Sequence, residues 1–78
     1  MTMKRIRLTV ESLGEPCLQC VDNDGTRHLV DTTMNAHTQL TSQRLSVGMR
    51  INAVSCIIDT EGVVHPQIII IEPDFLVD

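Results

Sequence analysis

Residues 49–72 read MRINAVSCIIDTEGVVHPQIIIIE and predict the β-hairpin on which the fold assignment rests. The stretch 49–59 is apolar at almost every second position, which is typical of a strand. Asp59-Thr60-Glu61-Gly62 pairs an aspartate that can bond nearby backbone with a glycine that tolerates a positive φ, so we predict a tight turn. The stretch 63–72 ends in four β-branched isoleucines and predicts a second strand. Pro66 cannot donate to a sheet ladder, so we expect a bulge or an edge position there.

The strand predicted over 49–59 has two largely apolar faces. One face carries Met49, Ile51, Ala53, Ser55 and Ile57. The other face carries Val54, Cys56 and Ile58, so we expect the second half of the strand to be covered on both sides. The isoleucines of 68–71 would favour aggregation on an open edge. We therefore expect the sheet to close over them or to bury them.

The first half of the chain predicts three more strands and repeats the same turn pattern. Apolar and polar residues alternate over 3–13, and Gly14-Glu15-Pro16 ends this strand. Two further strands, 17–22 and 26–32, flank Asp22-Asn23-Asp24-Gly25, for which we predict a type I turn closed by a glycine bulge. Two hairpins with one turn pattern indicate an antiparallel meander.

The segment 32–48 is rich in Thr, Ser, Gln, Asn and His and has only a weak helical pattern. We predict one short helix near 34–40, between the third and fourth strands. The apolar positions that support it are Met34, Ala36, Leu40 and Leu45.

Composition predicts one small globular domain over residues 1–78, with 73–78 as a C-terminal tail. Of the 78 residues, 42% are hydrophobic and 21% charged, which argues against disorder. The longest apolar run has four residues, so we expect no membrane-spanning segment, no signal peptide and no membrane partner. Three cysteines are an odd number that fits a reducing compartment, and we expect a cytoplasmic protein without disulfides. Phe75 is the only aromatic residue, and we expect it to dock on the domain.

Five strands with a helix between the third and the fourth resemble the OB-fold, a five-stranded Greek-key barrel. The stretch Val47-Gly48-Met49-Arg50-Ile51-Asn52-Ala53, followed by a hairpin and a strand ending in Ile71-Glu72-Pro73-Asp74, is similar to the last two strands of single-stranded-DNA-binding proteins of this fold. The resemblance covers about half the chain and points to no particular family. It implies an all-β, five-stranded antiparallel OB-like barrel with a minor helical part. An SH3-like barrel is the alternative, disfavoured by the long segment 32–48.

The resemblance also implies nucleic-acid binding along strands two and three. Our candidate nucleic-acid-binding residues are Lys4, Arg5, Arg7, Arg27, His28 and Arg50. A basic stripe of this kind would bind phosphates with modest, salt-sensitive affinity. Against this, the net charge is −4, and the predicted strands lack the aromatic side chains on which such proteins stack bases. The competing interpretation is a solvated face on which these cations pair with Glu11, Asp22 and Asp31.

Cys17-Leu18-Gln19-Cys20 has the spacing of metal knuckles and redox motifs. Possible further ligands are Cys56, His28, His37 and His65. However, a second closely spaced pair is missing, and positions i and i+3 of a strand point to opposite faces. We therefore predict free cysteines packed as small hydrophobic residues, with no metal or other cofactor. The turn 22–25 lacks the downstream ligands of a calcium loop.

We find no catalytic triad and no paired carboxylates beside an apolar pocket, so we expect no enzyme. The expected function is a non-enzymatic OB-like binding module that contacts single-stranded nucleic acid weakly, or a protein partner. One alternative is an assembly subunit that uses the isoleucine strand or the Phe75 tail as its interface. A second alternative is a zinc-stabilised small domain. The oligomeric state stays open.

Overall fold

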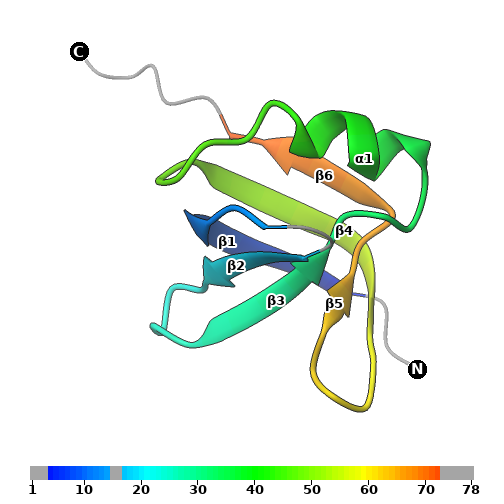
Figure 1. Ribbon diagram of the computed structural model, residues 1–78. Coiled ribbons are helices and arrows are strands. Elements are labelled where there is room, and N and C mark those ends of the chain that lie inside the picture. Colours follow the sequence, from blue (N-terminus) through cyan, green and yellow to red (C-terminus); the bar gives the residue numbers. More distant parts are fainter. Residues whose placement is uncertain (1–3, 15–16, 73–78) are drawn as a thin grey trace.

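The computed structural model describes residues 4–14 and 17–72, and the chain folds mainly into β-strands (Figure 1). In chain order the elements are β1 (Lys4–Ser12), β2 (Cys17–Val21), β3 (Arg27–Asp31), α1 (Ala36–Ser42), β4 (Arg50–Ile58), β5 (Val64–His65) and β6 (Ile68–Ile71). Each predicted strand is present close to its predicted range. The helix is also present between the third and fourth strands, shifted towards the C-terminus of the predicted range 34–40.

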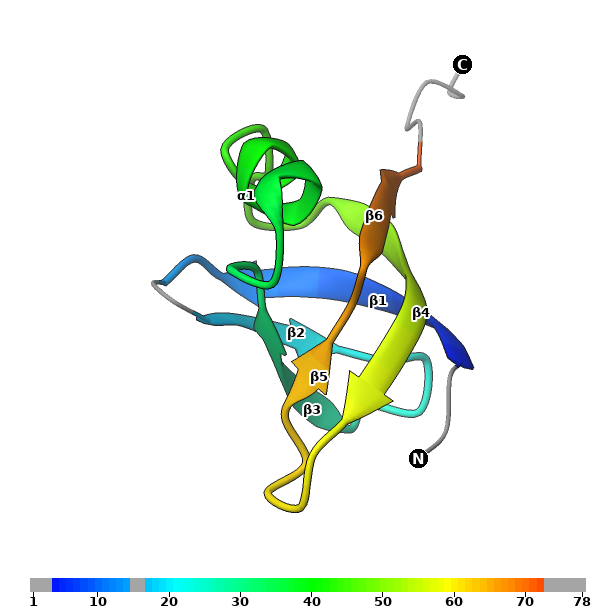
Figure 2. The ribbon, with the colours of Figure 1, turned by 90° about the vertical axis from the view of Figure 1, so that its right-hand side faces the viewer.

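The strands close into a small OB-like barrel (Figure 2). Hydrogen-bonded neighbours run in the order β1-β2-β3-β5-β4, and β4 returns to pair with β1. β5 and β6 both lie along β4 and form two parts of one interrupted strand, so the barrel has the five strands that the sequence predicted. All pairings are antiparallel except that between β3 and β5, which is parallel. This single parallel pairing closes the barrel.

The interruption of the fifth strand falls at Pro66, where the sequence predicted an irregularity. Pro66 is fully buried, and the next residue, Gln67, donates its N–H to the carbonyl of Val54 at 3.2 Å. β5 pairs with both β3 and β4, whereas β6 pairs with β4 alone. The proline removes one ladder donor, and past it the chain leaves β3 while it stays beside β4.

Both predicted turns have the same geometry. The N–H of the glycine, Gly25 or Gly62, donates to the carbonyl of the aspartate, Asp22 or Asp59, at 3.0 Å. The aspartate N–H in turn donates to the carbonyl of the residue after the glycine, at 2.9 and 3.1 Å. The glycine φ angles are +86° and +85°, in the left-handed region. These bonds and angles confirm type I turns closed by a glycine bulge.

A β-bulge in β4 changes which side chains face the core. Ser55 has a φ of +55°, and the register with β1 shifts between the pairs Ile6–Ala53 and Lys4–Cys56. The extra residue shifts the alternation by one position, so Cys56 joins Ala53 in the core. The prediction that Ser55 continues the face of Ala53 is therefore wrong. The expected cover on both sides is also wrong at the end of the strand, because Ile58 is exposed.

One contiguous core fills the barrel. Its fully buried members are Leu8, Val10, Leu18, Cys20, Val30, Leu45, Ile51, Ala53, Cys56, Val64 and Ile69. The isoleucine run contributes only one face to this core, because Ile68 and Ile70 are 41% and 46% exposed. The expectation that the run is enclosed therefore holds for one side of the strand. The expected docking of Phe75 lies outside the described residues.

Helix α1 lies over one end of the barrel (Figure 2). Asn35 caps it: the Asn35 side chain accepts from the N–H of Thr38 at 2.9 Å, and the Asn35 N–H donates to the Thr38 hydroxyl. The buried Thr38 hydroxyl also donates to the carbonyl of Thr32 at 2.9 Å, which ties the helix to the end of β3. Within residues 4–14 and 17–72, no helix has the length and apolar character needed to span a bilayer.

Candidate ligand face

Three of the predicted site residues lie on the outer face of β1 and β4. Strand alternation places Leu8 and Val10 of β1 in the core and sends Arg5 and Arg7 to the outside. β4 lies beside β1 with Arg50 opposite Thr9. Arg50 therefore lies next to the outer face of β1, so these cations lie on β1 and β4 and not along strands two and three, where the resemblance implied binding.

A polar cavity of about 460 Å³ lies on this outer face. It is lined by Arg7, Leu8, Thr9, Asp22, Asn23 and Arg50. Two guanidinium groups, a hydroxyl and an amide offer donors suited to a phosphate or a carboxylate. The carboxylate of Asp22 is already engaged, because its Oδ1 accepts two backbone N–H groups and its Oδ2 contacts His28. We call the outer surface formed by this cavity and Arg5 the ligand face.

Glu72 offsets part of the positive charge of this face. Arg7 donates to both carboxylate oxygens of Glu72, from Nε at 2.8 Å and from a terminal nitrogen at 3.0 Å. Asn52 Nδ2 donates to the same carboxylate at 2.6 Å. The hydrogen bond from Arg7 lowers the pKa of Glu72, and the pair raises the pKa of Arg7. An anion at Arg7 must therefore compete with a carboxylate.

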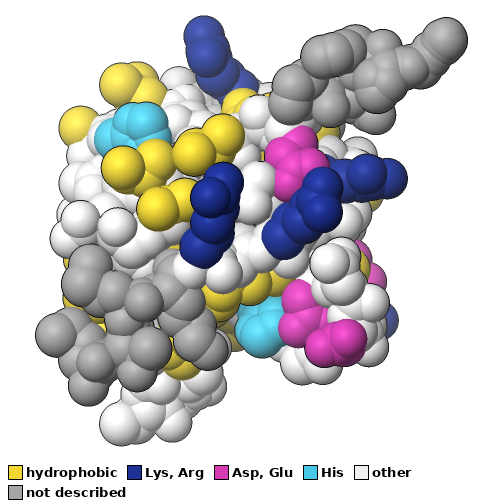
Figure 3. Space-filling view, turned by 180° about the vertical axis from the view of Figure 1, so that it is seen from behind, with side chains coloured by type: hydrophobic (Ala, Val, Ile, Leu, Met, Phe, Trp, Pro, Cys, Tyr) yellow, Lys and Arg dark blue, Asp and Glu magenta, His cyan; other side chains and the backbone are white. Residues whose placement is uncertain are grey.

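The remaining predicted site residues lie elsewhere or carry partners of their own. Arg27 on β3 is separated from β1 by β2, and its Nε donates to Glu11 at 3.0 Å. His28 contacts Asp22 through Nε2 at 2.9 Å. Lys4 begins β1. Among the described residues, Arg5 and Arg50 form no ion pair within 4.0 Å. In Figure 3 some arginine side chains (dark blue) touch acidic side chains (magenta), and others stand apart from them.

A cluster that the sequence analysis missed links Asp31, Asp59 and His65. His65 Nδ1 lies 3.0 Å from Asp31 Oδ2, and His65 Nε2 lies 2.9 Å from Asp59 Oδ2. The hydrogen bond to Asp59 raises the pKa of His65, and the hydrogen bond to Asp31 and the charges of both carboxylates act in the same direction. Partial burial of the ring acts in the opposite direction but is outweighed. The bonds from His65 and from the backbone of Val63 lower the pKa of Asp59. Against the opposing effect of its own partial burial, bonds from Thr33 and His65 lower the pKa of Asp31.

Cys17, Cys20 and Cys56 form no disulfide with one another. Cys20 faces the core, and burial raises its pKa to about 11. Cys17 lies three residues earlier in the same strand and is only partly buried, opposite Asp31 of β3. Burial and the nearby carboxylates of Asp31 and Asp59 raise the pKa of Cys17, so its thiol stays protonated at neutral pH. In the described part of the chain, no three His, Cys, Asp or Glu side chains are arranged to hold a metal ion.

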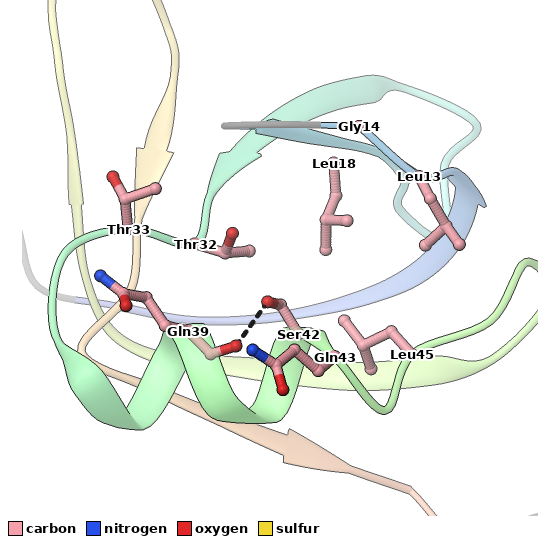
Figure 4. A pocket seen from close by; sticks show the side chains of 9 residues that line it. All are labelled: Leu13, Gly14, Leu18, Thr32, Thr33, Gln39, Ser42, Gln43 and Leu45. Atoms are coloured by element: carbon pink, nitrogen blue, oxygen red, sulfur yellow. Dashed lines mark hydrogen bonds between the residues drawn. The ribbon is translucent and has the colours of Figure 1, made fainter.

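A second and larger cavity, of about 880 Å³, lies between α1 and the end of β1 (Figure 4). Gln39 and Ser42 of α1 and Gln43 just after it line one side, and the side chains of Leu13, Leu18 and Leu45 provide an apolar surface. The described lining is uncharged. The Ser42 hydroxyl is already engaged with the carbonyl of Gln39 at 2.8 Å. This cavity offers no charge to an anion, unlike the ligand face.

Comparison of the chain with protein-family models, with curated proteins and with solved structures gives no match. The protein is therefore classified from its strand topology and its surface cavities alone. It is a small OB-like barrel with a polar, arginine-lined cavity on the outer face of β1 and β4.

Proposed function

We propose that this chain is a non-enzymatic binding module that holds single-stranded nucleic acid weakly on the ligand face. The observation that carries the proposal is the cavity in which Arg7 and Arg50 flank Thr9 on adjacent strands. Arg5 lies about 7 Å further along β1, because residues i and i+2 share a face and each rises about 3.3 Å. A row of guanidinium groups favours a chain of repeated phosphates over one isolated anion.

Three features make this binding weak. The net charge is −4, so long-range attraction of a polyanion is absent. Arg7 is shared with Glu72. The strands contain no aromatic residue, although base stacking contributes roughly 1–3 kcal/mol per base in proteins that bind single strands. Phosphate contacts then supply most of the affinity, and we expect it to fall steeply as salt increases.

Titration of the isotope-labelled protein with oligothymidylate at low salt tests this proposal. We expect the amide signals of Arg7, Thr9 and Arg50 to shift, and the shifts to reverse on addition of salt. Arg50→Ala should weaken binding and make the plot of log affinity against log salt shallower by about 0.7 for one lost phosphate contact. Arg44→Ala is the matched control, because it removes the same charge from a residue outside the cavity lining.

The proposal fails if no amide shifts at low salt, or if Arg44→Ala weakens binding as much as Arg50→Ala does. A polyglutamate peptide serves as a second probe. If it shifts the same amides with equal affinity, the ligand face binds an acidic protein partner and not nucleic acid.

A further inference from the structure

The two turns share a longer pattern than the turn itself, D-x-x-G-x-x-H. The pattern places Asp22 six residues before His28, and Asp59 six residues before His65. In each case Oδ1 of the aspartate accepts two backbone N–H groups, all at 2.9 Å. Oδ2 of each aspartate lies 2.9 Å from Nε2 of the histidine. The chain therefore contains two copies of one Asp–His arrangement.

The copies differ at the second ring nitrogen. Nδ1 of His65 faces Oδ2 of Asp31 at 3.0 Å. No second carboxylate of the described residues lies within 4.0 Å of His28. An ionised carboxylate can only accept hydrogen bonds, so a ring with a carboxylate at each nitrogen is satisfied only when both nitrogens carry a proton. The geometry around His65 thus selects the imidazolium form, and the geometry around His28 does not require it.

His65 lies where the barrel closes. Asp31 is the last residue of β3, His65 belongs to β5, and Asp59 begins the turn between β4 and β5. The parallel pairing of β3 with β5 rests on a single residue pair, Val30 and Val64, both of them fully buried. The His65 ring therefore adds side-chain bonds across the pairing that has the least backbone support.

We propose that the His65 imidazolium, held between Asp31 and Asp59, is a pH-dependent clasp that closes the barrel between β3 and β5. Loss of one ring proton would leave a nitrogen lone pair facing a carboxylate, and two carboxylates without the cation between them. The other groups that face this site cannot replace the lost ring N–H or its positive charge. Thr33 donates only to Asp31 Oδ1, Cys17 on β2 is a neutral thiol, and the β4 partner of His65 is Ile57.

The direction of the pH dependence follows from the pKa changes. The pKa of His65 is raised above its ordinary 6.5, so its stabilisation is complete below about pH 6.5 and is lost as pH rises through the raised value. The pKa values of Asp31 and Asp59 are lowered from 3.8, so their stabilisation is complete above that value and is lost as pH falls through the lowered values. The clasp is closed between these limits and opens as pH rises through the raised pKa of His65.

The test compares wild type, His65→Gln and His28→Gln between about pH 5.5 and 8.5, each without and with a chelator. For each protein we would measure the urea midpoint and the hydrogen-exchange protection of residues 30–31 and 64–65, corrected for intrinsic exchange. In wild type we expect both to fall as pH rises. His65→Gln should abolish this fall, and His28→Gln, which removes the matched ring from the other turn, should retain it.

The proposal is overturned if the urea midpoint and the protection of His65→Gln fall with rising pH as much as those of wild type. It is also overturned if His28→Gln no longer shows this fall. If His65→Gln does not fold, the wild-type ring decides the question by a long-range proton–nitrogen spectrum. Two protonated nitrogens on His65 at pH 6.5 support the clasp, and a neutral ring at that pH overturns it. Protection in wild type that drops when the chelator is added overturns it in favour of a bound metal.

Discussion

At the scale of single residues, the turns show how far local chemistry specifies structure. Asp22-Asn23-Asp24-Gly25 and Asp59-Thr60-Glu61-Gly62 predict their own geometry, because each bond involved spans four residues at most. The histidine that completes each arrangement is also visible in the sequence, as the repeated D-x-x-G-x-x-H spacing. The second carboxylate at His65 is not visible, because Asp31 lies 34 positions away and meets the ring only once the barrel closes.

Gly62 provides a direct test of the turn conformation. A Cβ built there has nothing within 4 Å, so a substitution causes no clash, but the φ of +85° disfavours any residue with a Cβ. We expect Gly62→Ala to cost about 1 kcal/mol, from about 1–2 kcal/mol of left-handed strain less the entropy removed from the unfolded chain. Gly62→Asn is the control and should cost less, because asparagine tolerates this region. Urea unfolding measures both, and an equal loss in the two variants would contradict the explanation.

At the scale of elements, α1 depends on its cap. A helix of seven residues is too short to be stable by itself. We expect Asn35→Ala to destabilise the protein by about 1 kcal/mol, the usual value for a lost N-cap. Asn35→Asp keeps the oxygen that accepts from Thr38 but loses the amide that donates to the Gln67 carbonyl at 3.2 Å, so its loss should be smaller.

The control for the cap is Gln39→Ala, an exposed helix position where we expect a change within about 0.5 kcal/mol. Urea unfolding followed by circular dichroism compares the three variants. If Asn35→Asp is as destabilising as Asn35→Ala, the contact with Gln67 holds the helix in place and the cap does not.

The strands show a limit of periodicity. Alternation locates β1 and β4 well, because each has one face in the core. It fails at Ser55, since a bulge inserts a residue that composition does not mark, and every later side chain of β4 then changes face. The interruption at Pro66, in contrast, is predictable from the sequence, because proline lacks the N–H that a strand donates to its neighbour.

At the scale of the whole molecule, the distribution of charged residues along the sequence does not predict their distribution on the surface. Residues 51–78 contain five Asp or Glu residues and no Lys or Arg, which suggests a separate acidic region. The fold instead carries Glu72 back to Arg7, 65 positions away, because the end of the interrupted fifth strand runs beside β4, which in turn lies beside β1. One long-range pairing of strands thus reduces the basic character of the ligand face.

This pairing leads to a prediction about binding. Glu72→Gln removes the carboxylate that competes for Arg7, so we expect tighter binding of oligothymidylate at low salt. The plot of log affinity against log salt should also steepen by about 0.7, as for one added phosphate contact.

Glu61→Gln is the matched control, because it makes the same change in net charge on the β4–β5 turn, outside the cavity lining. If both variants bind equally more tightly, net charge governs the affinity. If only Glu72→Gln does, the competition is local to Glu72 and the two arginines that act on it, Arg7 and Arg50. An unchanged affinity in Glu72→Gln would show that Arg7 contacts no phosphate and would restrict the ligand face to Arg5 and Arg50.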